Sequence, residues 1–123
     1  MTLVMIIAED PQVSLSFAIF LEAGGHSICR TRNVQEAIEH FDHYHPDVFV
    51  TDLPTPVENG FNSIKELKAS HPDIPIIVAY NGEDASHTTP AILEMALAAG
   101  ADKAFAKPVD PVAMNAAVEP EAR

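Results

Sequence analysis

Three acidic residues and one lysine stand where short apolar runs of the sequence end. Glu9 and Asp10 follow the first run, Asp52 follows the third, and Lys107 follows the last. Carboxylates brought to one place repel each other, and this repulsion favours the binding of a cation. Oxygen ligands with room for several waters are typical of an Mg²⁺ site. We therefore predict an Mg²⁺ site, provided that the fold brings the ends of these runs together.

Each of these residues also has an ordinary structural interpretation. Asp10 stands before a proline, as Asp110 does, so on its own it is better explained as a helix cap than as a metal ligand. Asp52 also fits the opening of a loop, and Lys107 also fits a solvated lysine. Chance is a poor explanation for four residues with charges suited to a site at the ends of three runs, so a functional site is the better interpretation.

Five short apolar runs predict the strands that must position these residues. The runs are residues 2–8, 26–30, 47–51, 74–80 and 103–106. The first, third and fourth are nearly continuous rather than alternating. This pattern is typical of a parallel sheet that helices cover on both faces.

Helical periods separate the runs, and their starts carry capping signals. Asp10, Thr89 and Asp110 each precede a proline, and Asn33 begins a capping-box-like segment. We expect the first helix to begin after Asp10, the fourth to begin at Pro90 and the fifth to begin after Asp110. Five strands alternating with five helices predict one α/β domain, and the flavodoxin-like strand order 2-1-3-4-5 is the commonest arrangement.

The predicted domain covers residues 1–118, and residues 119–123 form a C-terminal tail. The third helix is marked by Ile64 and Leu67, and we expect Lys68, like Lys65, to face water. The sequence is compatible with a stand-alone module and with a piece of a longer regulator.

The charge balance argues against two classes of partner. The chain has 123 residues, with 7 Lys and Arg against 18 Asp and Glu, and a formal net charge of -11. Nucleic acid and anionic membranes are therefore repelled. The single cysteine, Cys29, cannot form an intramolecular disulfide, and the apolar run 3–8 is too short to cross a bilayer. We expect a cytoplasmic protein.

These motifs together resemble the response-regulator receiver domain, over almost the whole chain. The resemblance rests on the acid pair after the first strand, on Asp52 with the loop residues after it, and on a glycine-alanine-aspartate approach to the lysine. The residues that carry it are Glu9, Asp10, Asp52, Leu53, Pro56, Gly60 and the segment GADKAFAKP, residues 100–108.

The resemblance implies a signalling module rather than an enzyme. Asp52 would accept a phosphoryl group from a phosphohistidine on a sensor histidine kinase or a histidine phosphotransferase. Asp10 and Asp52 would bind Mg²⁺ directly with the backbone carbonyl of Pro54, Glu9 would act through water, and Lys107 would hold a phosphate oxygen. The downstream protein target is unknown, and a homodimer is left open.

The sequence departs from the family at its switch region. Tyr80 stands where the family places Ser or Thr, and Asn81 replaces the usual alanine. Ala104 stands where Tyr or Phe is favoured, with Phe105 facing the other way if the segment is a strand. We expect the Tyr80 ring to occupy volume normally filled from the last strand, so that its phenol misses the contact of a short hydroxyl. In the alternative, Tyr80 points outward and Asn81 makes the polar contact.

Competing functions remain to be weighed. The main alternative is a phosphorylation-independent pseudo-receiver that acts as a protein-interaction module. A dehalogenase-type phosphatase needs a second aspartate where Pro54 stands, and a flavin or nucleotide site needs small residues where Glu9 and Asp10 stand. His40 and His43 are better explained as a solvated helix end than as metal ligands.

Overall fold

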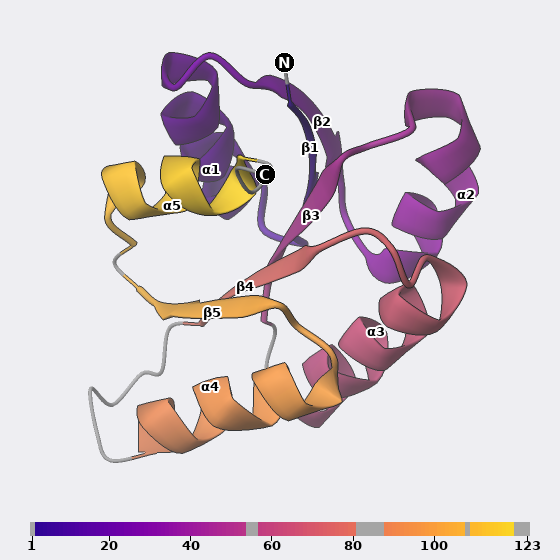
Figure 1. The fold of residues 1–123 in the computed structure, drawn as a ribbon, viewed down its shortest axis with the longest axis vertical. Coiled ribbons are helices and arrows are strands. Elements are labelled where there is room, and N and C mark those ends of the chain that lie inside the picture. Colours follow the sequence, from indigo (N-terminus) through magenta and orange to yellow (C-terminus); the bar gives the residue numbers. More distant parts are fainter. Residues whose placement is uncertain (1, 54–56, 81–87, 108, 120–123) are drawn as a thin grey trace.

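Strands and helices alternate along the chain (Figure 1). The computed structural model describes residues 2–53, 57–80, 88–107 and 109–119. The strands are β1 Leu3–Ile7, β2 Ser27–Thr31, β3 Val48–Asp52, β4 Ile76–Tyr80 and β5 Lys103–Ala106. The helices are α1 Pro11–Ala23, α2 Val34–Tyr44, α3 Val57–Ser70, α4 Thr88–Ala99 and α5 Pro111–Val118. Among the described residues, no helix combines the length and the apolar character that a membrane crossing requires.

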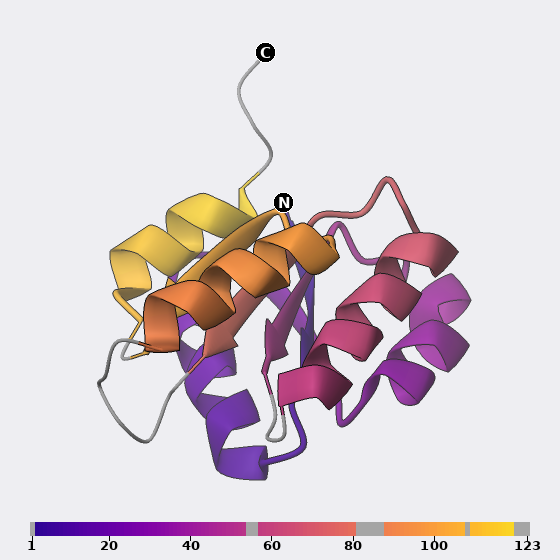
Figure 2. The same cartoon turned by 90° about the horizontal axis from the view of Figure 1, so that it is seen from below.

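The five strands form one parallel sheet in the order β2-β1-β3-β4-β5, which confirms the predicted fold. Helices α1 and α5 cover one face, and α2, α3 and α4 cover the other (Figures 1 and 2). In such a sheet all strands point the same way, so their carboxyl ends meet along one edge. The residues that follow β1, β3 and β5 are therefore carried to that edge.

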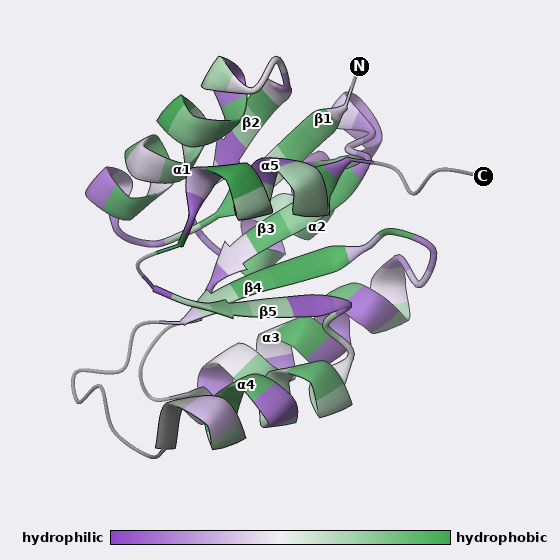
Figure 3. Cartoon of the chain, turned by 60° about the vertical axis from the view of Figure 1, so that its left-hand side comes forward, coloured by the Kyte–Doolittle hydropathy of each residue, from purple (hydrophilic) through white to green (hydrophobic). Residues whose placement is uncertain are grey.

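The core consists of two apolar clusters, one on each face of the sheet. Strand β4 shows the division, because Ile76, Val78 and Tyr80 belong to the cluster under α2–α4, whereas Ile77 and Ala79 belong to the cluster under α1 and α5. Figure 3 shows the central strands as hydrophobic along most of their length. Burial on both faces accounts for the nearly continuous apolar runs in the sequence.

Three of the predicted helix caps are present. The cap side chain accepts a hydrogen bond from a backbone N–H of the first turn, at 2.8 Å for Asp10, 2.9 Å for Asn33 and 3.1 Å for Asp110. The predicted start of α4 at Pro90 is wrong, because that helix begins at Thr88. A proline is tolerated anywhere in the first turn, where the backbone N–H groups have no partner within the helix.

Lys68 is more buried than predicted, with a side chain that is 27% exposed. Its Nζ lies 2.9 Å from Asp102 Oδ2 and 3.3 Å from the carbonyl oxygen of Ile74, whereas Lys65 is exposed. The same oxygen of Asp102 accepts a hydrogen bond from the Ile76 backbone N–H at 2.8 Å. Asp102 thus joins α3, the start of β4 and the approach to β5.

Candidate functional site

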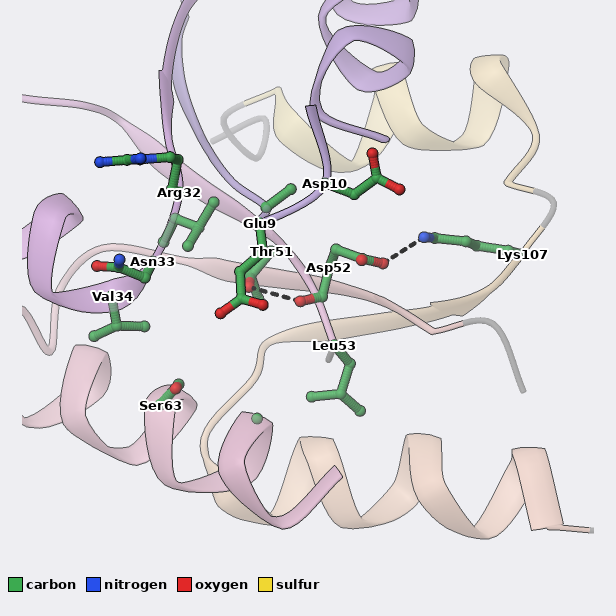
Figure 4. A pocket seen from close by; sticks show the side chains of 13 residues that line it. Glu9, Asp10, Arg32, Asn33, Val34, Thr51, Asp52, Leu53, Ser63 and Lys107 are labelled. Atoms are coloured by element: carbon green, nitrogen blue, oxygen red, sulfur yellow. Dashed lines mark hydrogen bonds and ion pairs between the residues drawn. The ribbon is translucent and has the colours of Figure 1, made fainter. Parts of the chain in front are cut away.

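The carboxyl edge of the sheet encloses a cavity of ≈ 400 Å³ (Figure 4). Asp52 enters it as the last residue of β3, Glu9 and Asp10 enter it after β1, and Lys107 enters it after β5. The structure therefore brings together the four residues that the strand ends singled out. Pro54, the other expected metal ligand, lies outside the described residues.

Asp52 and Lys107 form a hydrogen-bonded ion pair at one end of the cavity, and their side chains point toward each other in Figure 4. The side chains are only 21% and 19% exposed, respectively. Lys107 Nζ also lies 5.5 Å from the centroid of the Phe17 ring of α1, a cation–π contact. Such partial burial makes the pair less sensitive to salt than a surface ion pair.

Asp10 has two roles in this geometry. It caps α1 through the hydrogen bond from the Gln12 N–H, and it also lines the cavity. The capping interpretation is confirmed, and the metal-binding role stays a prediction. Both Asp10 and Glu9 are exposed, so their carboxylates are hydrated.

The carboxylate groups that line the cavity are of the kind that binds Mg²⁺. Three carboxylates line the cavity, and Mg²⁺ binds one or two carboxylates while it keeps several of its waters. Within the part of the chain that the structure describes, no three His, Cys, Asp or Glu side chains are packed closely enough to form a complete metal site. A largely hydrated ion on Asp10 and Asp52 does not need such a set.

The Tyr80 side chain lies in the core and not at the cavity. It is 7% exposed and belongs to the α2–α4 cluster, against which Ala104 also packs, whereas Phe105 packs on the opposite cluster. The alternative in which Tyr80 points outward is therefore wrong. Tyr80 is not among the cavity-lining residues, as expected for a phenol that cannot replace a short hydroxyl. Asn81 lies outside the described residues.

The cavity extends further toward α2 and α3 than the sequence analysis predicted. Arg32, Asn33 and Ser63 line this part. The Arg32 side chain is 78% exposed and forms an ion pair with Glu36 at 3.3 Å. Arg32 follows β2, so the rule that selects residues after strand ends would also have found it. Ser63 lies inside a helix, where that rule gives no signal.

An open parallel sheet of this order, with an acidic cavity at the carboxyl ends of its strands, places the chain among the flavodoxin-like α/β proteins. Residues 4–119 match the model of the response regulator receiver domain. The chain belongs to this family, whose members are signalling modules of two-component systems that interact with sensor kinases and downstream targets.

Curated relatives match over part of the chain. Response regulator RR06 of Streptococcus pneumoniae serotype 2 is 32% identical over 75 residues, which are 60% of this chain and 34% of RR06. The polar-differentiation response regulator DivK of Brucella ovis is 33% identical over 69 residues, which are 55% of this chain and 56% of DivK. The chain thus spans less than two thirds of these relatives.

Solved structures share the fold over nearly the whole chain. A response regulator receiver domain protein from Clostridium thermocellum has a TM-score of 0.80 at 20% identity, over 96% of this chain and 91% of that one. A response regulator protein from Burkholderia pseudomallei, solved with a phosphorylated aspartic acid, a calcium ion and citrate, has a TM-score of 0.76 at 24% identity. That alignment covers 97% of this chain and 67% of the other.

Proposed function

We propose that this chain is a phosphoacceptor receiver module, which takes a phosphoryl group onto Asp52 from a phosphohistidine of a sensor histidine kinase or a histidine phosphotransferase. One observation carries the proposal. Asp52 is a largely buried carboxylate, paired with Lys107, in a cavity that Glu9 and Asp10 also line. A carboxylate nucleophile with a cation beside it and acidic metal ligands nearby is suited to phosphoryl transfer.

The transfer forms one bond and breaks one bond. A carboxylate oxygen of Asp52 attacks the phosphorus, while the bond from phosphorus to the donor's imidazole nitrogen breaks. That nitrogen keeps the electron pair and takes a proton from solvent when it needs one. Lys107 already contacts Asp52, so a small movement of its ammonium group brings it to an oxygen of the transferred group, where it acts as a point charge.

Asp10 and Asp52 would hold Mg²⁺ together with the backbone carbonyl of Pro54, and Glu9 would act through a bound water. When bound, Mg²⁺ offsets the negative charge that gathers on the transferring phosphoryl group. Without a cation, the carboxylates of Glu9, Asp10 and Asp52 repel an anionic donor. The receiver fold accommodates this chemistry, since the Burkholderia pseudomallei structure contains a phosphorylated aspartic acid and a calcium ion.

The output is a change in how the module binds a protein partner. A phosphoryl group adds a charge of about -1.5 to -2 at Asp52, and such a charge biases a two-state rearrangement of the surrounding segments. The net charge of -11 favours a protein target over nucleic acid. We place the module in the cytoplasm, where phosphohistidine donors of this kind act.

The first test is incubation with MgCl₂ and either acetyl phosphate or phosphoramidate, followed by intact mass spectrometry. The wild type is expected to gain the mass of one phosphoryl group, and Asp52→Asn or an excess of EDTA is expected to prevent the gain. Asp110→Asn is the matched control, because Asp110 caps α5 and does not line the cavity. No added mass on the wild type with either donor would refute the proposal.

The pseudo-receiver is the second candidate, and the position of Tyr80 favours it. Among the described residues, none of β4 lines the cavity, so that strand offers no hydroxyl there to a phosphoryl group on Asp52. Binding measurements with a protein partner that is isolated with the wild type would distinguish the receiver from the pseudo-receiver. Binding that is equal for the untreated wild type, the phosphorylated wild type and Asp52→Asn would favour the pseudo-receiver, whereas binding that changes on phosphorylation would favour the receiver.

A further inference from the structure

The end of β4 lies between the two partners of the Asp52–Lys107 ion pair. Asp52 ends β3 and Lys107 follows β5, and β4 separates these strands in the sheet (Figure 1). The Leu53 N–H donates to the carbonyl oxygen of Ala79, and the Lys107 N–H donates to that of Tyr80, both at 2.9 Å. The last two residues of β4 therefore hold the backbone on both sides of the ion pair.

The ring of Tyr80 anchors this end of β4. Tyr80 has the largest side chain in the strand, and it is 7% exposed. It shares a buried cluster with Leu53, which follows Asp52, and with Ala96 of α4. Ala104 of β5 packs against the same cluster. Two alanines on neighbouring elements leave room for a ring, and close packing then restricts how far β4 can shift.

We propose that Tyr80 is a positioning residue for the phosphoacceptor site. Its buried ring anchors the end of β4, and the carbonyl oxygens of Tyr80 and Ala79 then fix the spacing between Asp52 and Lys107. Tyr80 does not line the cavity, so it acts through the backbone and is not a catalytic residue. The inference rests on the proposed function, but its central claim concerns the backbone on both sides of the ion pair, whose protection can be measured without phosphorylation.

The direct test is amide hydrogen exchange measured by NMR at the Lys107 and Leu53 N–H groups. Tyr80→Ala is expected to lower protection at both amides by about tenfold or more, because local opening no longer has to displace the ring. Tyr80→Phe keeps the ring and should stay within about threefold of the wild type. Tyr80→Leu serves the same purpose as Tyr80→Ala if the alanine variant does not fold.

Leu67→Ala is the matched control for lost core volume. Leu67 is fully buried in the same cluster, but it lies near the C-terminal end of α3 and not at the end of β4. Leu67→Ala should lower global stability and leave the Lys107 and Leu53 amides no less protected than other core amides. An equal selective loss at the two amides in this variant, or no loss in Tyr80→Ala, would overturn the proposal.

The rate of phosphorylation distinguishes the positioning role of Tyr80 from the phosphoacceptor function on which that role rests. With acetyl phosphate, Tyr80→Ala should lower the maximal phosphorylation rate by about tenfold, since small misplacements of reacting groups are costly, while Tyr80→Phe restores the rate. Leu67→Ala should keep the wild-type rate per folded molecule, and an equal slowing there would count against Tyr80. If the wild type takes no phosphoryl group, the receiver function fails, and amide exchange alone decides whether Tyr80 holds the backbone at Leu53 and Lys107 in place.

Discussion

At the scale of single residues, Asp10 shows how one side chain serves both the fold and the site. Its Oδ1 accepts the hydrogen bond that caps α1, and its carboxylate also lines the cavity beside Asp52. Asparagine caps helices about as well as aspartate but carries no charge. A single substitution can therefore separate the two roles.

We predict that Asp10→Asn weakens the response to Mg²⁺ and leaves the fold nearly unchanged. The free energy of unfolding should change by no more than about 1 kcal/mol, because the cap is retained and only the charge at the helix N-terminus is lost. The Mg²⁺ concentration that half-saturates phosphorylation should rise by about tenfold, the equivalent of 1.4 kcal/mol, if Asp10 is one of the few carboxylate ligands that we propose for the ion. Urea unfolding and phosphorylation rates at varied MgCl₂ provide the two measurements.

Asp110→Asn is the control for this substitution, since it makes the same change at the cap of α5, away from the cavity. It should reproduce the small effect on stability and keep the wild-type Mg²⁺ response. An unchanged Mg²⁺ response in Asp10→Asn would remove Asp10 from the metal site and leave it as a cap alone.

At the scale of elements, Asp102 holds the amino end of β4 as Tyr80 holds its carboxyl end. One oxygen of Asp102 accepts from Lys68 Nζ at 2.9 Å and from the buried Ile76 N–H at 2.8 Å. The two contacts differ in energy. The ion pair is partly exposed, whereas the backbone N–H of Ile76 is removed from water and has a high cost if it loses its acceptor.

We predict that Asp102→Ala lowers the free energy of unfolding by about 2 kcal/mol, because it leaves the Ile76 N–H without its acceptor. Lys68→Met removes the ion pair and the longer contact of Lys68 Nζ with the Ile74 carbonyl oxygen, but it keeps the acceptor of the Ile76 N–H, and it should cost less than about 1 kcal/mol. Urea unfolding of both variants compares the two contacts. Equal losses in the two variants would show that the contacts of Lys68, and not the hydrogen bond from the Ile76 N–H, stabilise the junction of α3, β4 and β5.

The same elements show what could be predicted from sequence. Strands β1, β3 and β4 were predictable because burial on both faces leaves nearly continuous apolar runs, and the caps of α1, α2 and α5 have local signals. The Lys68–Asp102 pair joins residues 34 positions apart, and no local pattern encodes such a contact. Alternation predicted that Ala104 and Phe105 face opposite ways, and the small Ala104 led us to expect a Tyr80 ring in the space beside the last strand, where it is buried. The contribution of Ala96 from α4 to the same cluster has no local signal.

In the candidate site, too, some residues were predictable from the sequence and others were not. Glu9, Asp10, Asp52 and Lys107 were predictable because parallel strands carry their carboxyl ends to one edge. Ser63 was not, because it reaches the cavity from the side of α3, and its place depends on how α2 and α3 pack. Strand ends alone therefore predict the part of the cavity that the sheet builds, and miss the part that helices build.

At the scale of the whole molecule, the net charge of -11 acts on stability as well as on partners. Self-repulsion among acidic side chains destabilises the compact state, and salt screens it. We predict that the urea midpoint rises as NaCl is raised from about 10 to 150 mM, over which the Debye length falls from about 30 to 8 Å.

MgCl₂ at matched ionic strength separates the general charge effect from the site. The wild type should gain more stability from MgCl₂ than from NaCl, because binding to the folded state alone adds stability. Asp52→Asn should lose most of this difference. A midpoint that falls with NaCl would contradict the general effect, and an Mg²⁺ gain that Asp52→Asn keeps would place the bound ion elsewhere.

The position of Lys107 after the last strand also bears on when the protein becomes competent during its synthesis. Asp52 and Lys107 are 55 residues apart, and every strand of the sheet precedes Lys107 along the chain. Chains emerge from the ribosome amino end first. A nascent chain that already carries Asp52 therefore lacks its lysine partner until β5 has been made and has docked beside β4. Completion of the sheet and formation of the Asp52–Lys107 ion pair therefore fall at the same stage of synthesis.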